Sequence, residues 1–94
     1  MLVDFSLELP TGSSWEYEGE EFLSVPRVGE GIVVDDSEQD VEVYGTVTGV
    51  FWSAAGDNGW RPNLRVKIND VAGEGREKYL AGEEKEETGK ANEN

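Results

Sequence analysis

"GVFWSAAGDNGWRPNLRVKI", residues 49–68, predicts a β-hairpin and with it the fold class of the chain. Asn58-Gly59 is a strong signal for a hairpin turn, because both residues accept positive φ angles. The flanking segments are rich in β-branched and aromatic residues, which favour strands. Pro62 lacks an amide donor close to the turn, which indicates a loop wider than two residues.

The register of this hairpin predicts two different faces. With the turn centred on Asn58-Gly59, Phe51 pairs with Val66 and Trp52 pairs with Arg65. Because paired residues share one face of a sheet, Phe51 would lie on an apolar face. Trp52 would lie on the opposite face, where it could stack on Arg65 as a cation–π pair.

Period-two alternation extends this β pattern toward the N-terminus. Apolar and polar residues alternate over residues 3–9 and again over 14–18, which is typical of half-buried strands. Residues 32–34 and 41–52 add further strand-like segments, separated by polar and glycine-rich turns. We therefore predict a single all-β domain over residues 1–70.

The C-terminal part loses this pattern. Residues 71–81 predict a short helical turn around 76–80, or an extended linker. Residues 82–94 are acidic and almost free of apolar side chains, so they cannot bury enough surface to offset the entropy of ordering. We expect a disordered acidic tail there.

Three segments carry a resemblance to a known fold: "VPRVGEGIVV" (25–34), "VYGTVTGVFW" (43–52) and "PNLRVKI" (62–68). Over residues 22–68 the chain resembles the small SH3-like barrels of short bacterial and bacteriophage proteins. The resemblance implies a small antiparallel barrel that binds peptides, protein surfaces or nucleic acid through aromatic loops. The additional strands at 2–9 and 14–18 leave an OB-like barrel or a small β-sandwich as alternatives.

The charge of the chain limits its partners. Residues 1–60 contain thirteen acidic residues and one basic residue, and the whole chain has a net charge of −13. Such a surface repels nucleic acid and anionic membranes and attracts a basic protein. Solubility, or adaptation to a salty cytoplasm, would equally explain the acidity.

Two sets of acidic residues alternate with other residues. They are Glu16, Glu18 and Glu20 in the first set, and Asp36, Glu38, Asp40 and Glu42 in the second. In an extended chain, residues two apart lie about 6.6 Å from each other on one face. A row of charges with this spacing could imitate a nucleic-acid backbone and occupy a basic groove. The alternative is that these charges protect edge strands from aggregation.

The hairpin supplies a second candidate surface, formed by Trp52, Trp60, Arg61, Arg65 and Lys67. Trp60 lies near the tip of the loop and is the best candidate for an exposed anchor, since tryptophan is enriched at binding hot spots. The alternative is that these aromatic residues fill the core. Exposure of Val50 and Trp52 on one strand would also allow homo-oligomers.

The residues for common enzyme chemistry are missing. The chain has no histidine and no cysteine, so the usual pairs of nucleophile and base cannot form. An EF-hand loop starting at Asp36 would need glycine at its sixth position and glutamate at its twelfth, where Val41 and Val47 stand. We predict no enzyme activity, no metal and no cofactor.

The first hypothesis is therefore a protein-binding domain, such as a phage-type inhibitor of a host protein, whose acidic surface occupies a basic nucleic-acid-binding site. The alternative is a structural or adaptor barrel that binds a peptide or subunit through the hairpin. Residues 1–10 show neither a basic region nor a long apolar run, so we expect no signal peptide. The expected location is the cytoplasm of a bacterium, or of the host cell for a phage-encoded protein.

Overall fold

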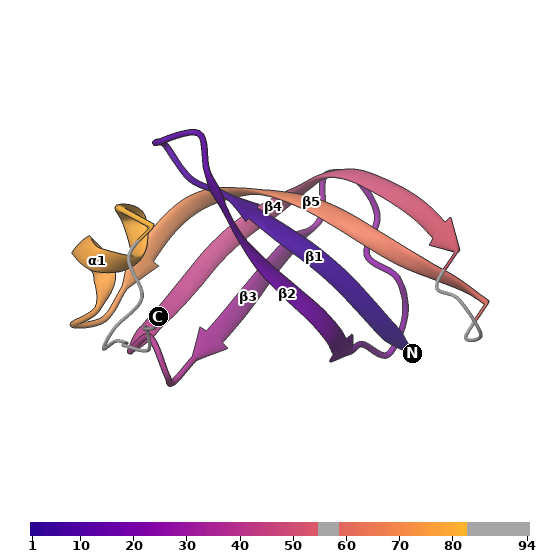
Figure 1. Ribbon diagram of the computed structural model, residues 1–94, viewed down its shortest axis with the longest axis horizontal. Coiled ribbons are helices and arrows are strands. Elements are labelled where there is room, and N and C mark those ends of the chain that lie inside the picture. The colour runs from indigo at the N-terminus through magenta and orange to yellow at the C-terminus, as the bar shows by residue number, and fades with distance from the viewer. Residues whose placement is uncertain (55–58, 83–94) are drawn as a thin grey trace, which may run out of the picture.

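The computed structural model describes residues 1–54 and 59–82, and these form one curved five-stranded sheet with a short helix at one end (Figure 1). The strands are β1 (Leu2–Glu8), β2 (Ser14–Glu21), β3 (Gly31–Asp36), β4 (Val41–Ala54) and β5 (Trp60–Ala72), and the helix is α1 (Arg76–Leu80). The prediction of an all-β domain is confirmed. The predicted tail, residues 82–94, lies outside the described residues except for Gly82.

The sheet has the strand order β2-β1-β5-β4-β3 and is mixed. The neighbours β1 and β5 run parallel, whereas the other three pairs are antiparallel. The expectation of a wholly antiparallel barrel is therefore wrong at this pair. The reason is the connection over residues 22–30, which carries the chain to the far edge of the sheet before β4 and β5 return to β1. Alternation along a strand predicts its faces but not its neighbours.

The core lies on one face of this curved sheet. Alternate residues of the strands point to that face, and the eleven buried hydrophobic residues are Val3, Phe5, Leu7, Leu9, Val41, Val43, Val47, Leu64, Val66, Val71 and Tyr79. None of the described polar or charged residues is buried. The outer face carries most of the charge, as expected when successive side chains of a strand alternate between core and solvent.

Helix α1 closes one end of the barrel. Its Tyr79 is 1% exposed and stacks on Trp15 of β2, with ring centroids 4.7 Å apart. The Trp15 indole Nε1 donates a hydrogen bond of 2.8 Å to the Tyr79 carbonyl. The predicted helical turn at 76–80 is confirmed, and Tyr79 makes it part of the core, which the sequence pattern did not indicate.

A hydroxyl cluster ties the two edge strands together at this closed end. The Tyr17 hydroxyl on β2 donates to Asp36 Oδ2 on β3 at 2.8 Å and lies 2.7 Å from the Tyr79 hydroxyl. Burial raises the pKa of Tyr79 to about 12 and raises the pKa of Tyr17 far above its usual value. Both hydroxyls therefore stay protonated over the physiological range.

The β4–β5 hairpin has a different register from the predicted one. Phe51 pairs with Asn63 and Trp52 pairs with Pro62, three residues from their predicted partners. A bulge between Val47 and Gly49 changes the register by one residue, which makes the difference an odd number and reverses the faces. Phe51 and Trp52 have therefore exchanged faces relative to the prediction. The predicted turn at 58–59 lies partly outside the described residues, and Gly59 has a φ of +78°.

No helix within the described ranges is long and apolar enough to cross a membrane.

Candidate functional site: the β4–β5 arm

The β4–β5 hairpin extends beyond the body of the barrel (Figure 1). Strand β1 pairs with β5 only from residue 63 to residue 67, so the outer end of β5 pairs with β4 alone. We call residues 52–54 and 60–62 the arm. They are the outer ends of β4 and β5, which are 14 and 13 residues long, and in this stretch β5 pairs with no strand other than β4 among the described residues.

Two tryptophans lie on the same face of the arm. Trp52 pairs with Pro62, and Trp60 is two residues from Pro62 on β5, so alternation places all three on the core-facing side. Pro62 is buried, but Trp52 is 52% exposed and Trp60 is 70% exposed. We call Trp52 and Trp60 the tryptophan face. It continues the core surface of the sheet past the point where the barrel ends.

A shallow depression adjoins this face. It has a volume of about 320 Å³ and is lined by Met1, Leu2, Trp60, Arg61 and Pro62. Met1 and Leu2 are both about half exposed. Met1, Leu2 and Pro62 could not be assigned to this surface from the sequence, because the parallel pairing that brings β1 beside β5 leaves no local signal there.

Two of the three cations predicted for the hairpin surface lie close to acidic residues of the same chain. Arg61 Nη1 lies 3.2 Å from Asp4 Oδ1, and both side chains are only about one-fifth exposed. Arg65 Nε lies 3.7 Å from Glu8 Oε2. Lys67 is exposed and pairs with Glu8 in the parallel ladder. Of these three cations, Arg61 is held closely by Asp4, Arg65 lies within reach of Glu8 but stays exposed, and Lys67 forms no ion pair with the described residues.

The predicted stacking of Arg65 on Trp52 is wrong. Arg65 instead lies over Phe51, with its guanidinium carbon 5.1 Å from the ring centroid. The exchanged faces of the hairpin explain this, since Phe51 now shares the outer face with Arg65. Phe51 also packs over Gly49, where a Cβ atom would lie 3.1 Å from the ring. Gly49 thus leaves room for the aromatic ring.

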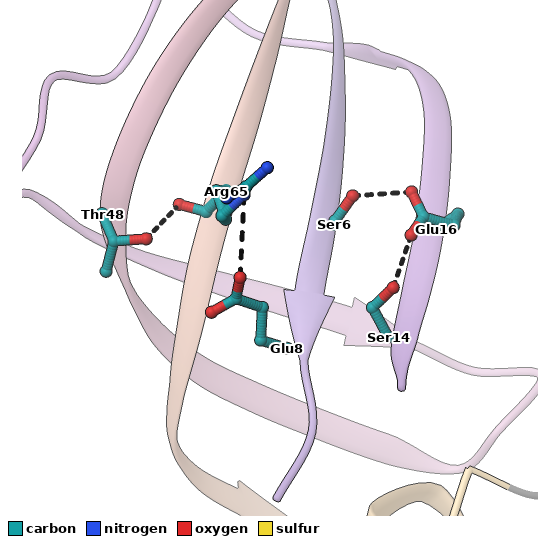
Figure 2. A network of polar contacts seen from close by, with 6 residues as sticks. All are labelled: Ser6, Glu8, Ser14, Glu16, Thr48 and Arg65. Atoms are coloured by element: carbon teal, nitrogen blue, oxygen red, sulfur yellow. Dashed lines mark hydrogen bonds and ion pairs between the residues drawn. The ribbon is translucent and has the colours of Figure 1, made fainter. Parts of the chain in front are cut away.

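Glu16 and Arg65 belong to polar contacts on the outer face of the sheet (Figure 2). Ser6 and Ser14 each donate a hydrogen bond of 2.6 Å to the Glu16 carboxylate, and these bonds, the one from Ser14 first, lower its pKa. The Thr48 hydroxyl donates to the Arg65 carbonyl at 3.1 Å. Glu16 is therefore oriented by its own neighbours and is less available to a partner than an isolated surface carboxylate.

The first predicted row of acidic residues is interrupted. Gly19 has a φ of +68°, and a bulge at this point lets Val3 pair with Glu20. Because Val3 points to the core face, Glu20 lies on the opposite face from Glu16 and Glu18. The expectation of one continuous row on β2 is wrong for this reason.

The second predicted row does not lie in extended chain. Asp36 ends β3, Glu38 and Asp40 lie in the turn that follows, and only Glu42 belongs to β4. Asp36 Oδ1 accepts hydrogen bonds from the amides of Glu38 and Gln39 at 3.1 and 3.2 Å. Asp40 has a φ of +60°, and Glu42 accepts a hydrogen bond from the Tyr44 hydroxyl. These four residues shape a hairpin turn rather than a regular line of charge.

The described residues include no group of three or more acidic, histidine or cysteine side chains that could hold a metal ion. Comparison with protein-family models, with curated proteins and with solved structures finds no match to this chain. The features of the described residues that bear on function are therefore the exposed arm and the negative charge of the body.

Proposed function

We propose that this chain is a non-enzymatic protein-binding domain that docks its tryptophan face onto a partner protein. The observation that carries the proposal is the exposure of Trp52 and Trp60 on one side of a protruding arm. Exposed tryptophans in a cluster are characteristic of binding hot spots. This reverses the order of the two hypotheses from the sequence, because the acidic rows are interrupted whereas the tryptophans are exposed.

The acidic body supports a basic partner. A net charge of −13 on 94 residues produces a strong negative field around the molecule. Complementary charge chiefly raises the rate of association, and it makes that rate dependent on salt. In this proposal the body attracts a basic protein from a distance, and the tryptophan face supplies the affinity at short range.

The experiment starts from a partner captured from a bacterial lysate and purified. Its affinity is measured by calorimetry for the wild type, for Trp52→Ala and Trp60→Ala, and for Leu23→Ala as a control that removes an exposed apolar side chain from the connection between β2 and β3. Each tryptophan variant is expected to weaken binding about 30-fold or more, as hot-spot residues do. Equal affinities for all four proteins would refute the proposal.

A second candidate is the phage-type inhibitor whose acidic surface occupies a basic nucleic-acid-binding site. The net charge of the chain favours it, since edge protection needs only a few of these charges. In this case Glu16→Gln/Glu18→Gln/Glu20→Gln would weaken binding strongly, and the tryptophan variants would bind like the wild type. Loss of that binding on raising the salt concentration would be the accompanying sign.

We also propose that the fold is of the SH3-like kind. Five strands around one core support a small barrel of the SH3-like kind. The parallel β1–β5 pair departs from the antiparallel barrel that this resemblance implies. We expect such a binding module to act in the cytoplasm. Homo-oligomerisation through the tryptophan face is a further expectation, which sedimentation of the purified protein would test.

A further inference from the structure

The sheet leaves two free edges that face each other across a groove. Strands β2 and β3 are the outermost strands of the described sheet, and the Tyr17 hydroxyl of β2 donates to Asp36 of β3 at the closed end. Away from that contact lies a groove of about 250 Å³, which we call the seam. Its lining residues are Phe5, Glu20, Glu21, Phe22, Ile32, Val33, Val34 and Asp35.

The lining shows that the seam follows the edge of β3. Residues 32–35 are consecutive, and their side chains alternate between the two faces of the sheet. One cavity can contact all four only if it runs along the strand where the backbone is accessible. The seam is therefore a place where another strand can approach β3.

The floor of the seam is apolar. Phe5 is 3% exposed, and Phe22 packs edge-on against it with ring centroids 6.0 Å apart. Ile32 and Val34 are partly buried against the same core. Side chains of an added strand that pointed to this side would be removed from water, which favours apolar residues at every second position.

The rim of the seam is acidic. Glu20 and Glu21 lie on the β2 side and Asp35 on the β3 side, and the described lining contains no lysine or arginine. The Glu20 and Asp35 side chains form no ion pair or hydrogen bond with the described residues, whereas the Glu21 carboxylate forms an ion pair of 2.5 Å with the N-terminal ammonium of Met1. Like charges on both sides disfavour closing the barrel by direct pairing of β2 with β3. A strand with basic side chains would remove this repulsion.

The backbone of β3 can supply hydrogen bonds to such a strand. Val47 on β4 directs its amide to the Glu30 carbonyl and its carbonyl to the Gly29 amide. Since these directions alternate along paired antiparallel strands, the register of β3 with β4 points the backbone groups of Val33 and Asp35 away from β4 and toward the seam.

We propose that the seam binds an extended segment of a protein in which lysine or arginine alternates with apolar residues, and that this segment adds to the edge of β3 as a further strand. Strand addition takes affinity from main-chain hydrogen bonds and specificity from alternate side chains. This site is separate from the tryptophan face and does not depend on it.

The first test uses a capped heptapeptide, Lys-Val-Lys-Val-Lys-Val-Lys, with a fluorescent label. Binding is measured by anisotropy beside three control peptides: one with glutamate in place of lysine, and two with N-methyl groups on either the lysines or the valines. The glutamate peptide is expected not to bind, and at least one N-methylated peptide is expected to bind about tenfold more weakly. Equal binding of both N-methylated peptides and the parent would overturn strand addition.

The second test uses matched variants of the protein. Glu20→Gln/Asp35→Asn neutralises the rim, and Glu18→Gln/Glu74→Gln makes the same change in net charge elsewhere. The rim variant is expected to lose about fivefold or more in affinity, with little change in the control. Equal losses would show that the peptide responds only to overall charge and would overturn the proposal.

A backbone variant completes the design. Val33→Pro removes an amide that points to the seam, and Val33→Thr changes the side chain but keeps that amide. Only Val33→Pro is expected to lose peptide binding, and circular dichroism checks its fold. If Val33→Pro does not fold, hydrogen exchange in the wild type decides: the peptide must protect the amides of Val33 and Asp35. Trp60→Ala should bind the peptide normally, which separates this test from that of the proposed function.

Discussion

The two ends of the barrel use the same kinds of side chain in opposite ways. At the closed end, Trp15 and Tyr79 stack against each other, and Tyr79 is 1% exposed. At the arm, Trp52 and Trp60 are more than half exposed. Alternation places residues of both groups on the core-facing side of the sheet. The two groups differ in exposure because α1 lies over the closed end, whereas none of the described helices lies over the arm.

The polar atoms of these aromatic residues follow the same division. The indole of Trp15 and the hydroxyls of Tyr17 and Tyr79 all form hydrogen bonds within the described structure. The indoles of Trp52 and Trp60 form none with the described residues. Buried tyrosine and tryptophan need such partners, whereas exposed ones keep their polar atoms for water or for a partner. The closed end is therefore expected to govern stability, and the arm to govern binding.

Removing the Tyr79 side chain should cause the largest loss of stability at the closed end. Tyr79→Ala empties the space under α1 and removes the ring that stacks on Trp15. Truncation of a large buried aromatic side chain typically costs about 3–5 kcal/mol. Urea denaturation followed by circular dichroism should show this loss, or a chain that no longer folds cooperatively. A loss below 1 kcal/mol would mean that α1 does not belong to the core.

Alkaline pH should cause the second-largest loss of stability, again at the closed end. Burial raises the pKa of Tyr79 to about 12 in the folded state, whereas an unfolded tyrosine ionises near 10. The stabilisation is therefore complete below pH 10 and is lost as the pH rises toward 12, by about 2–3 kcal/mol. Urea denaturation at pH 8 and at pH 11 should show about half of this loss, 1–2 kcal/mol, because pH 11 lies midway between the two pKa values. Tyr79→Phe is the control: it lacks this ionisable group and should lose less stability over the same interval.

Removing the Asp4 side chain, at the base of the arm, should cause an intermediate loss of stability. Asp4 accepts hydrogen bonds from Arg61 and from the Gly19 amide at 3.2 and 2.7 Å. Asp4→Ala leaves the amide and the guanidinium without this acceptor, at a cost of about 1–2 kcal/mol because water reaches the site in part. Thermal denaturation should detect the change. Glu18→Ala, a neighbouring exposed carboxylate, should by comparison change stability very little.

The sequence allowed the strands to be predicted but not their arrangement. Period-two alternation identifies Val3, Phe5 and Leu7 as core residues, and all three are buried. The parallel pairing of β1 with β5 depends on contacts between residues about 60 positions apart, which no local pattern records. Tyr79 was not predicted to be a core residue for the same reason. An aromatic residue in a short polar helix becomes part of the core only when β2 lies beneath it.

The candidate site was predicted in part. The place of Trp60 beside a glycine-rich loop predicts an exposed anchor; its 70% exposure agrees with the exposed position, and its role in binding stays a prediction. The faces of Phe51 and Trp52 were predicted the wrong way round, because the bulge after Val47 shifts the register by one residue. A bulge has no reliable signature in sequence, and the same limit explains the misplacement of Glu20 by the bulge at Gly19.

Removing a tryptophan from the arm should have the smallest effect on stability. Trp60→Ala takes away a side chain that is 70% exposed and has few neighbours to lose. The unfolding free energy should change by no more than about 0.5 kcal/mol, the usual limit for surface substitutions. Urea denaturation of Trp60→Ala beside Trp15→Ala provides the measurement, since the second variant loses the stacking and the hydrogen bond to Tyr79. A loss for Trp60→Ala as large as that for Trp15→Ala would show that the arm is held by the fold, and its tryptophans would then be structural residues.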